Sequence, residues 1–168
     1  MGRTRIIFIG IAAAVIIVAL GVIINYNHSS AKYNIYRDHR ELFEAVKDET
    51  ELLMTSRDNR SDIGNTFIYS NNGNAVGHQF LDGVDADLQG KVGQIIAVSE
   101  DKLNFLRYSR QNGKSLLRFV FDWEGENGGT YHIVYCDSQD LVEKAYSEEP
   151  VNYKLHTLAD GWYGVEIK

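Results

Sequence analysis

The fold class follows from residues 103–123, LNFLRYSRQNGKSLLRFVFDW, in which two apolar runs flank the tetrapeptide Gln111–Lys114. Its Asn-Gly pair tolerates the positive φ angles of a type I′ turn, which joins neighbouring antiparallel strands. Within the second run, Phe119 and Phe121 alternate with other residues, and successive strand residues point to opposite faces. We therefore expect a hairpin of strands 103–109 and 116–123, with Phe119 and Phe121 on the core face.

Further runs with the alternating pattern of β-strands follow this hairpin. The glycine-rich stretch 124–129 leads to an alternating run at 130–136, and two further runs, 151–158 and 162–167, are joined at Ala159–Gly161. Asp137 or Ser138 is placed to cap a short helix that ends near Tyr146. A short strand at 66–70 could precede the hairpin. These patterns predict an antiparallel sheet of about five strands with one helical excursion.

The segment before the hairpin has helical spacing. Apolar residues recur every three or four positions over 38–54, Asp38 and Glu41 resemble a capping box, and residues 55–66 are loop-like. A second helical pattern covers 84–96 despite Gly90 and Gly93, which we interpret as signs of close packing. Helices followed by a sheet predict an α+β fold. The residues expected to be buried are Leu42, Phe43, Val46, Phe119, Phe121, Ile133 and Val165.

An uncharged apolar run extends from Ile6 to Ile24. These 19 residues would form a helix of roughly 28 Å, close to the ~30 Å hydrocarbon thickness of a bilayer. Arg3 and Arg5 precede the run, and no Lys or Arg follows before Lys32, so the positive-inside rule keeps the N-terminus in the cytoplasm. We expect a single-pass transmembrane helix with the rest of the chain outside the cell.

The competing interpretation is a cleaved signal peptide. Small residues at Ser29 and Ala31 would suit a cut after Ala31, which would release a secreted domain. The apolar run is longer than the ~7–15 residues usual for a signal peptide, which favours a retained anchor. Both interpretations export the domain.

The expected organisation is a cytoplasmic tip at 1–5, a transmembrane helix at 6–24, a polar connector at 25–36 and an exported α+β domain at 37–168. Of the 17 basic residues, 15 follow the apolar run, as do all 23 acidic ones, which leaves that part a formal charge of −8. A net negative domain argues against nucleic acid and against anionic lipid headgroups as partners.

The thiol and imidazole groups do not form a recognisable catalytic pattern. Cys136 is the only cysteine, so no internal disulfide is possible, and a small buried hydrophobe on a strand is the simplest interpretation. His132 lies four residues earlier, about 13 Å along a strand and beyond hydrogen-bond reach. A pair between Cys136 and His156 on neighbouring strands stays geometrically open. The remaining histidines, His28, His39 and His78, show no metal-binding spacing.

One stretch has part of a calcium-loop pattern. Asp85, Asp87 and Gln89 fall at positions 1, 3 and 5, with Gly90 at position 6, but position 12 is Ile96, where a bidentate Glu should be. The same stretch fits a capped helix, which would separate the ligands, and we favour that interpretation. The sequence therefore assigns no metal site, cofactor or catalytic residue.

The leading functional hypothesis is a non-enzymatic domain, tethered to the membrane through 6–24, that binds a protein or cell-surface partner. Dense aromatic residues in the sheet would suit such a surface if some of them face solvent, but we favour the interpretation that the helices cover them. The first alternative is a small cell-envelope hydrolase with a carboxylate or Cys–His site. The second is a pilin-like subunit, which a membrane helix leading into a small sheet resembles, although the apolar run lacks the glutamate and processing site of that class.

Overall fold

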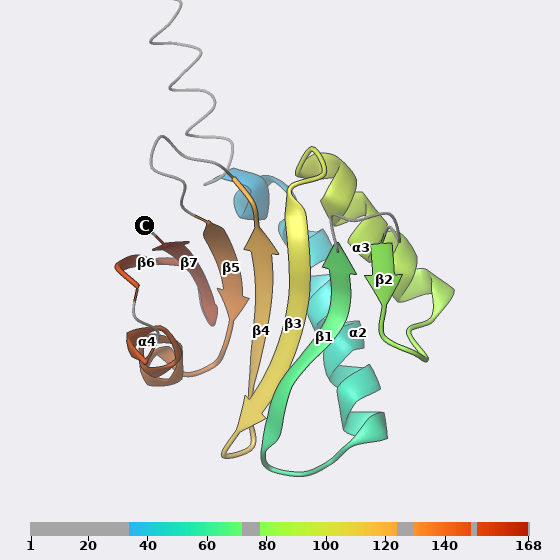
Figure 1. Ribbon diagram of the computed structural model, residues 1–168, viewed down its shortest axis with the longest axis horizontal. Coiled ribbons are helices and arrows are strands. Elements are labelled where there is room, and N and C mark those ends of the chain that lie inside the picture. The colour runs from blue at the N-terminus through green and yellow to red at the C-terminus, as the bar shows by residue number, and fades with distance from the viewer. Residues whose placement is uncertain (1–33, 72–77, 124–129, 149–150, 168) are drawn as a thin grey trace, which may run out of the picture. The chain divides into compact units, whose positions relative to one another are not determined.

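A computed structural model describes residues 34–71, 78–123, 130–148 and 151–167 of the protein. Residues 35–168 belong to one compact unit in which helices pack against an antiparallel sheet, so the predicted α+β class is confirmed (Figure 1). No helix within the described ranges is long and apolar enough to cross a membrane. The expected transmembrane run, 6–24, lies outside these ranges.

Within the described residues, the sheet has seven strands in the order β2-β1-β3-β4-β5-β7-β6, and all neighbours are antiparallel. The Asn-Gly turn joins β3 to β4 as expected, with positive φ angles at Asn112 and Gly113. The strands are β1 (Ile63–Asn71), β2 (His78–Phe80), β3 (Leu103–Gln111), β4 (Lys114–Phe121), β5 (Tyr131–Tyr135), β6 (Tyr153–Ala159) and β7 (Trp162–Ile167).

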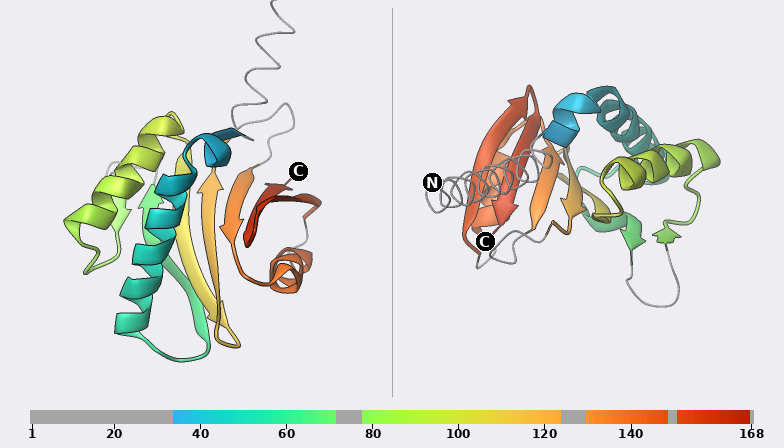
Figure 2. Two further views of the ribbon diagram at one scale, coloured as in Figure 1. Left: turned by 180° about the vertical axis from the view of Figure 1, so that it is seen from behind. Right: turned by 90° about the horizontal axis from the view of Figure 1, so that it is seen from above.

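The helices cover the two faces of the sheet unequally. The helices α2 (Arg40–Arg57) and α3 (Ala86–Val98) lie together on one face, which we call the α2/α3 face (Figure 2). The short helix α4 (Gln139–Ser147) packs on the other, the α4 face, near β5 and β7. Among the described helices, only α4 covers the α4 face, and it does so at one end of the sheet.

Each face has its own apolar core because successive strand residues point to opposite sides. On β5, Ile133 enters the larger core beneath α2 and α3, while its neighbour Val134 enters the smaller core beneath α4. In the larger core, Phe43 of α2 meets Phe119 edge-to-face, with ring centroids 4.9 Å apart. Of the seven residues predicted to be buried, six are fully buried and Leu42 is partly buried.

The strand number expected from the sequence, about five, is too low. The strand β1 is nine residues long and carries two register shifts, between Ile63 and Thr66 and between Phe67 and Tyr69. Bulges of this kind break the two-residue alternation, so only a fragment of β1 shows the strand pattern. The strand β2 has three residues, too few for any period to be visible.

The start of the first predicted helix also differs. Residues 34–38 are helical, and a turn at His39 separates them from α2. Ile35 and Tyr36, which we expected in the connector, are buried in the larger core. The expected capping box does not form, because His39 occupies the N-cap position of α2 and Asp38 pairs with Arg37 at 3.0 Å.

Gly90 and Gly93 were interpreted as marks of close packing, and this interpretation is wrong. A Cβ placed on either residue would meet nothing within 4 Å outside the neighbouring backbone of α3. The glycines are therefore not required by any contact that the structure describes.

Candidate functional site

The structure separates the residues that a Cys–His site would need. Cys136 follows β5 and lies fully buried on the α4 face beside Val142, and burial raises the pKa of its thiol. His156 lies on β6, which is not next to β5, and aligns with Gly164 on the α2/α3 face. The Cys136–His156 pair left open by the sequence is therefore excluded.

The partial calcium pattern belongs to a helix cap. The Asp85 carboxylate accepts a hydrogen bond from the Leu88 backbone N–H at 2.9 Å and caps α3, while Asp87 forms an ion pair with Lys91 one turn later. The two carboxylates thus serve different partners. Across the described ranges, no group of three or more histidine, cysteine or acidic side chains is arranged to hold a metal ion.

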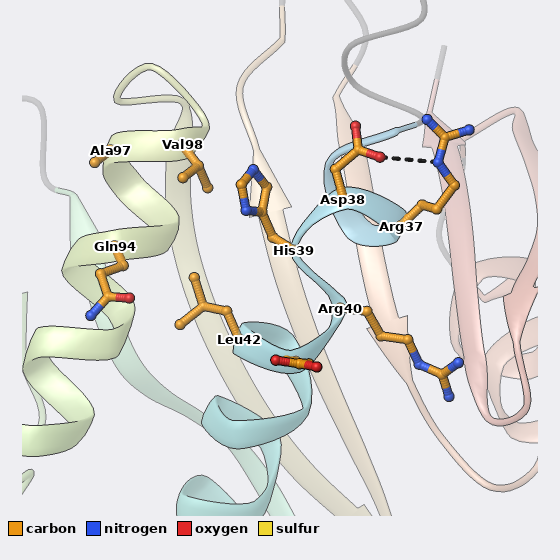
Figure 3. Close-up of a pocket in the computed structure, with 9 residues that line it drawn as sticks. Arg37, Asp38, His39, Arg40, Leu42, Gln94, Ala97 and Val98 are labelled. Carbon is orange, nitrogen blue, oxygen red and sulfur yellow. Dashed lines mark hydrogen bonds and ion pairs between the residues drawn. The ribbon is translucent and has the colours of Figure 1, made fainter.

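A shallow depression of about 870 Å³ lies where the start of α2 meets the end of α3 (Figure 3). Its lining includes His39 and Leu42 from one side and Gln94 and Val98 from the other. The basic groups at this depression are balanced by neighbouring acidic groups, as in the Arg37–Asp38 pair. None of its described lining residues form a group arranged to hold a metal ion.

Two polar side chains, Tyr131 and His156, lie next to Gly164 of β7 on the α2/α3 face. A Cβ at this position would collide with the hydroxyl of Tyr131 and lie 3.0 Å from Cδ2 of His156. The glycine thus provides the space in which these two side chains meet. Burial raises the pKa of Tyr131 to about 12.

Two aromatic side chains, the exposed Phe67 and the half-buried Phe105, lie on the α4 face away from α4. No described helix lies over β1 and β3 on this face (Figures 1 and 2). Phe67 of β1 and Phe105 of β3 meet there edge-to-face, with ring centroids 5.4 Å apart. Phe67 is 42% exposed, and it is one of only a few large hydrophobic residues so exposed in the described part of the chain.

Arg107 completes this surface. It lies opposite Phe67 in the β1–β3 register, and its guanidinium sits 4.7 Å from the centre of the Phe67 ring and 6.0 Å from that of Phe105. A cation over an aromatic face is attracted to it and holds both groups in place. We call Phe67, Phe105 and Arg107 the aromatic–arginine patch.

A buried polar group adjoins the patch. Arg118 of β4 is directly opposite Arg107, is 8% exposed and lies over the ring of Tyr146 of α4. The Tyr146 hydroxyl is 2.6 Å from Nδ1 of His132, and the Thr130 hydroxyl is 3.2 Å from Nε2 of the same ring. The patch is therefore continuous with a hydrogen-bonded group that links α4 to the sheet.

Electrostatics keep His132 uncharged. Burial of the imidazole, followed by repulsion from Arg118 and then Arg107, lowers the pKa of His132 to about 3. A neutral imidazole offers one donor and one acceptor nitrogen, and the two hydroxyl groups can serve either role. His132 is thus a structural partner of Tyr146 at neutral pH and carries no positive charge.

Sequence reasoning did not identify this site. The sequence feature that could have pointed to the site is the position of Arg107 and Arg118, each of which interrupts a run of apolar strand residues. Only the register shows that the two arginines are opposite each other, and only the position of α4 shows which face stays uncovered.

Comparison of the chain with protein-family models, with curated proteins and with solved structures finds no match. The function is therefore inferred from the chain's own geometry.

Proposed function

We propose that the protein is a membrane-tethered recognition domain, exported to the outer side of the membrane, that binds a protein partner through the aromatic–arginine patch. The observation that carries this proposal is the exposure of the Phe67 ring beside Arg107, on a part of the sheet over which no described helix lies. Tethering is inferred from the apolar run 6–24.

The composition of the patch supports a protein interface. Aromatic residues and arginine are enriched at the centres of protein–protein interfaces, where they contribute most of the binding energy. A phenyl ring left partly in water has apolar area still to be buried, at about 25 cal/mol per Å². The patch also lies on paired strands and not on a loop, so little ordering is needed when a partner binds.

The hydrolase alternative has less support. His132 and Cys136 lie on the α4 face of the sheet and His156 lies on the α2/α3 face, so these three groups do not converge on one cavity. The thiol is buried, which disfavours the thiolate that a nucleophile needs. His132 is held by two hydroxyl groups in the interior.

Photocrosslinking in intact cells tests the proposal. A benzophenone amino acid replaces Phe67 in the full-length chain, and the matched control carries it at Leu52, which is 72% exposed on α2 on the other side of the sheet. We expect one discrete adduct from position 67, none of that mass from position 52, and loss of the adduct when Phe105→Ala is added. Equal labelling of many proteins from both positions would reject the proposal.

A further inference from the structure

The turn between β3 and β4 carries a chemically labile dipeptide. Asn112 and Gly113 are both exposed to water and both have positive φ angles. Because glycine has no side chain, its backbone nitrogen can approach the carboxamide of a preceding asparagine without a clash. Attack of the Gly113 nitrogen on Cγ of Asn112 forms a five-membered succinimide, breaks the Cγ–Nδ2 bond and releases ammonia. The turn therefore contains both reactants of a deamidation.

The loop that precedes β1 holds the backbone of this turn. The Gly113 N–H donates to the backbone oxygen of Ser61 at 2.8 Å, and the Asn112 N–H donates to Oδ1 of Asp62, also at 2.8 Å. The hydrogen bond of a β-turn uses the N–H of its fourth residue and not that of its third, which Gly113 occupies here. The partner of the attacking nitrogen is thus supplied by a segment 50 residues earlier in the chain.

Arg110 fixes this loop to the hairpin. Its side chain is 9% exposed, and its guanidinium donates to the backbone oxygens of Asp58 and Arg60 at 3.4 and 3.3 Å. The Asp58 carboxylate in turn pairs with the Arg60 guanidinium at 2.6 Å. The residues that lead to Ser61 are therefore held by a buried side chain of β3 itself.

From these contacts we infer that Asn112–Gly113 is a deamidation site and that the loop 58–62 is a clamp that keeps it closed. While the Gly113 N–H donates to Ser61, its nitrogen keeps the proton that it must lose in order to attack. When the clamp opens, the succinimide forms and water hydrolyses it. Attack of water at Cγ gives aspartate, and attack at the backbone carbonyl carbon gives isoaspartate. Water is the only co-reactant, and the inference does not depend on the proposed function.

Both products change the hairpin. Each places a new carboxylate beside Asp62, whose own carboxylate already accepts the N–H of residue 112, and like charges repel. Isoaspartate also adds a CH₂ group to the backbone of a two-residue turn, and the turn geometry sets the register of a hairpin. Since β3 carries Phe105, the clamp protects the register that places one ring of the aromatic–arginine patch.

Peptide mapping of the full-length chain in phosphatidylcholine nanodiscs tests the inference. After incubation at neutral pH, mass spectrometry measures conversion at Asn112 separately from the Asn-Gly pairs at 72–73 and 127–128, which lie outside the described ranges. An isoaspartate methyltransferase with a labelled methyl donor identifies isoaspartate. The variant Asp62→Ala removes the acceptor and Asp62→Asn keeps a side-chain oxygen. The matched control Asp48→Ala removes an exposed carboxylate of α2, which pairs with Lys47.

We expect conversion at Asn112 to be at least about tenfold faster in the chain denatured with guanidinium chloride than in the folded wild type. Asp62→Ala should accelerate conversion in the folded protein by roughly tenfold, because a hydrogen bond to a charged group shifts an equilibrium by about that factor. Asp62→Asn should fall between Asp62→Ala and the wild type, and Asp48→Ala should match the wild type. Hydrogen exchange of the Gly113 amide should be faster in Asp62→Ala, with the rest of the sheet unchanged.

Four results would overturn the inference. Equal conversion in the folded and denatured wild type means that the turn is not protected. Wild-type conversion in Asp62→Ala, despite faster exchange of the Gly113 amide, means that the hydrogen bond does not limit the reaction. Acceleration accompanied by faster exchange throughout the sheet means that global unfolding exposes the turn. Equal acceleration by Asp48→Ala means that net charge, and not the clamp, sets the rate.

Discussion

The hydroxyl of Tyr146 lies 2.6 Å from Nδ1 of His132 and joins α4 to the centre of the sheet. Both residues are buried, and Tyr146 packs among apolar residues such as Val134 and Val142, with Arg118 over its ring. A hydrogen bond in such surroundings is costly to break, since neither group can turn to water. This hydrogen bond and the apolar cluster around Val142 together hold α4 on the sheet.

The first prediction concerns acid stability. The pKa of His132 is about 3 in the folded protein and about 6.5 in the unfolded chain, so between these values the unfolded chain binds one more proton. The stabilisation is complete above pH 6.5 and is lost as the pH falls toward 3. We expect a loss of about 2 kcal/mol between pH 7 and pH 5. Urea unfolding of the detergent-solubilised chain, followed by tryptophan fluorescence, measures it.

The variant His132→Gln isolates this contribution, because it removes the titrating group and keeps a polar side chain. Its unfolding free energy should fall less between pH 7 and pH 5 than that of the wild type. The variant His39→Gln, in the turn before α2, serves as the matched control and should behave as the wild type does. If the unfolding free energies of the wild type, His132→Gln and His39→Gln depended on pH in the same way, protonation of His132 would not destabilise the folded protein.

The second prediction contrasts two glycines. Gly164→Ala forces a methyl group against the Tyr131 hydroxyl, and the Tyr131 ring is fully buried and has no room to retreat. We expect a loss of about 1–3 kcal/mol. Gly90→Ala, on the exposed side of α3 with nothing within 4 Å, should instead stabilise the protein by up to ~1 kcal/mol. Chemical denaturation of both variants checks the opposite signs, and a neutral Gly164→Ala would contradict the tight packing.

The third prediction concerns Cys136. The thiol is fully buried and its pKa is raised by burial, so a thiol reagent should fail to label it in native buffer and should label it completely in urea. The variant Ser147→Cys places a second thiol at the exposed end of α4 and supplies a positive control in the same chain. Rapid native labelling of the wild type would mean that α4 opens readily.

Local patterns in the sequence were sufficient to predict which residues of the hairpin and of the neighbouring strands point toward a core. Phe119 and Ile133 were expected on a core face and are fully buried there. Their neighbours Val120 and Val134 are buried as well, because the sheet is covered on both sides at these strands. Val165 is also buried as expected, but in the smaller core beneath α4. Alternation identifies which residues share a face and not which helix covers that face.

The candidate site could not be predicted because it depends on long-range pairing. Phe67 lies on a strand interrupted by bulges, and its contact with Arg107 joins residues 40 positions apart in the sequence. Whether its ring is exposed depends on where α2, α3 and α4 pack. The spacing of apolar residues within one strand shows neither where the bulges lie nor that β1 pairs with β3.

The fourth prediction concerns the start of α3. The Asp85 side chain satisfies the Leu88 N–H, so Asp85→Ala should cost about 0.5–2 kcal/mol. Millimolar calcium should leave the melting temperature of the wild type unchanged. The control Asp87→Ala removes an exposed carboxylate paired with Lys91 and should cost less than Asp85→Ala. A calcium-dependent rise in melting temperature that disappears in Asp87→Asn would instead establish a binding loop.

The last prediction concerns residues 6–24, which we propose remain attached as a membrane anchor with the C-terminus outside. Nineteen apolar residues are enough to span a bilayer, and each buried CH₂ group contributes about 0.8 kcal/mol, so an uncleaved chain cannot leave the lipid. Arg3 and Arg5 set the direction, because no basic residue follows the run before Lys32. Fractionation of cells that express a C-terminally tagged chain should place the full-length protein in the membrane pellet, and protease added to intact protoplasts should digest it. A soluble product beginning at Lys32 would identify a signal peptide cleaved after Ala31, and complete protection from the protease would show that the orientation is reversed.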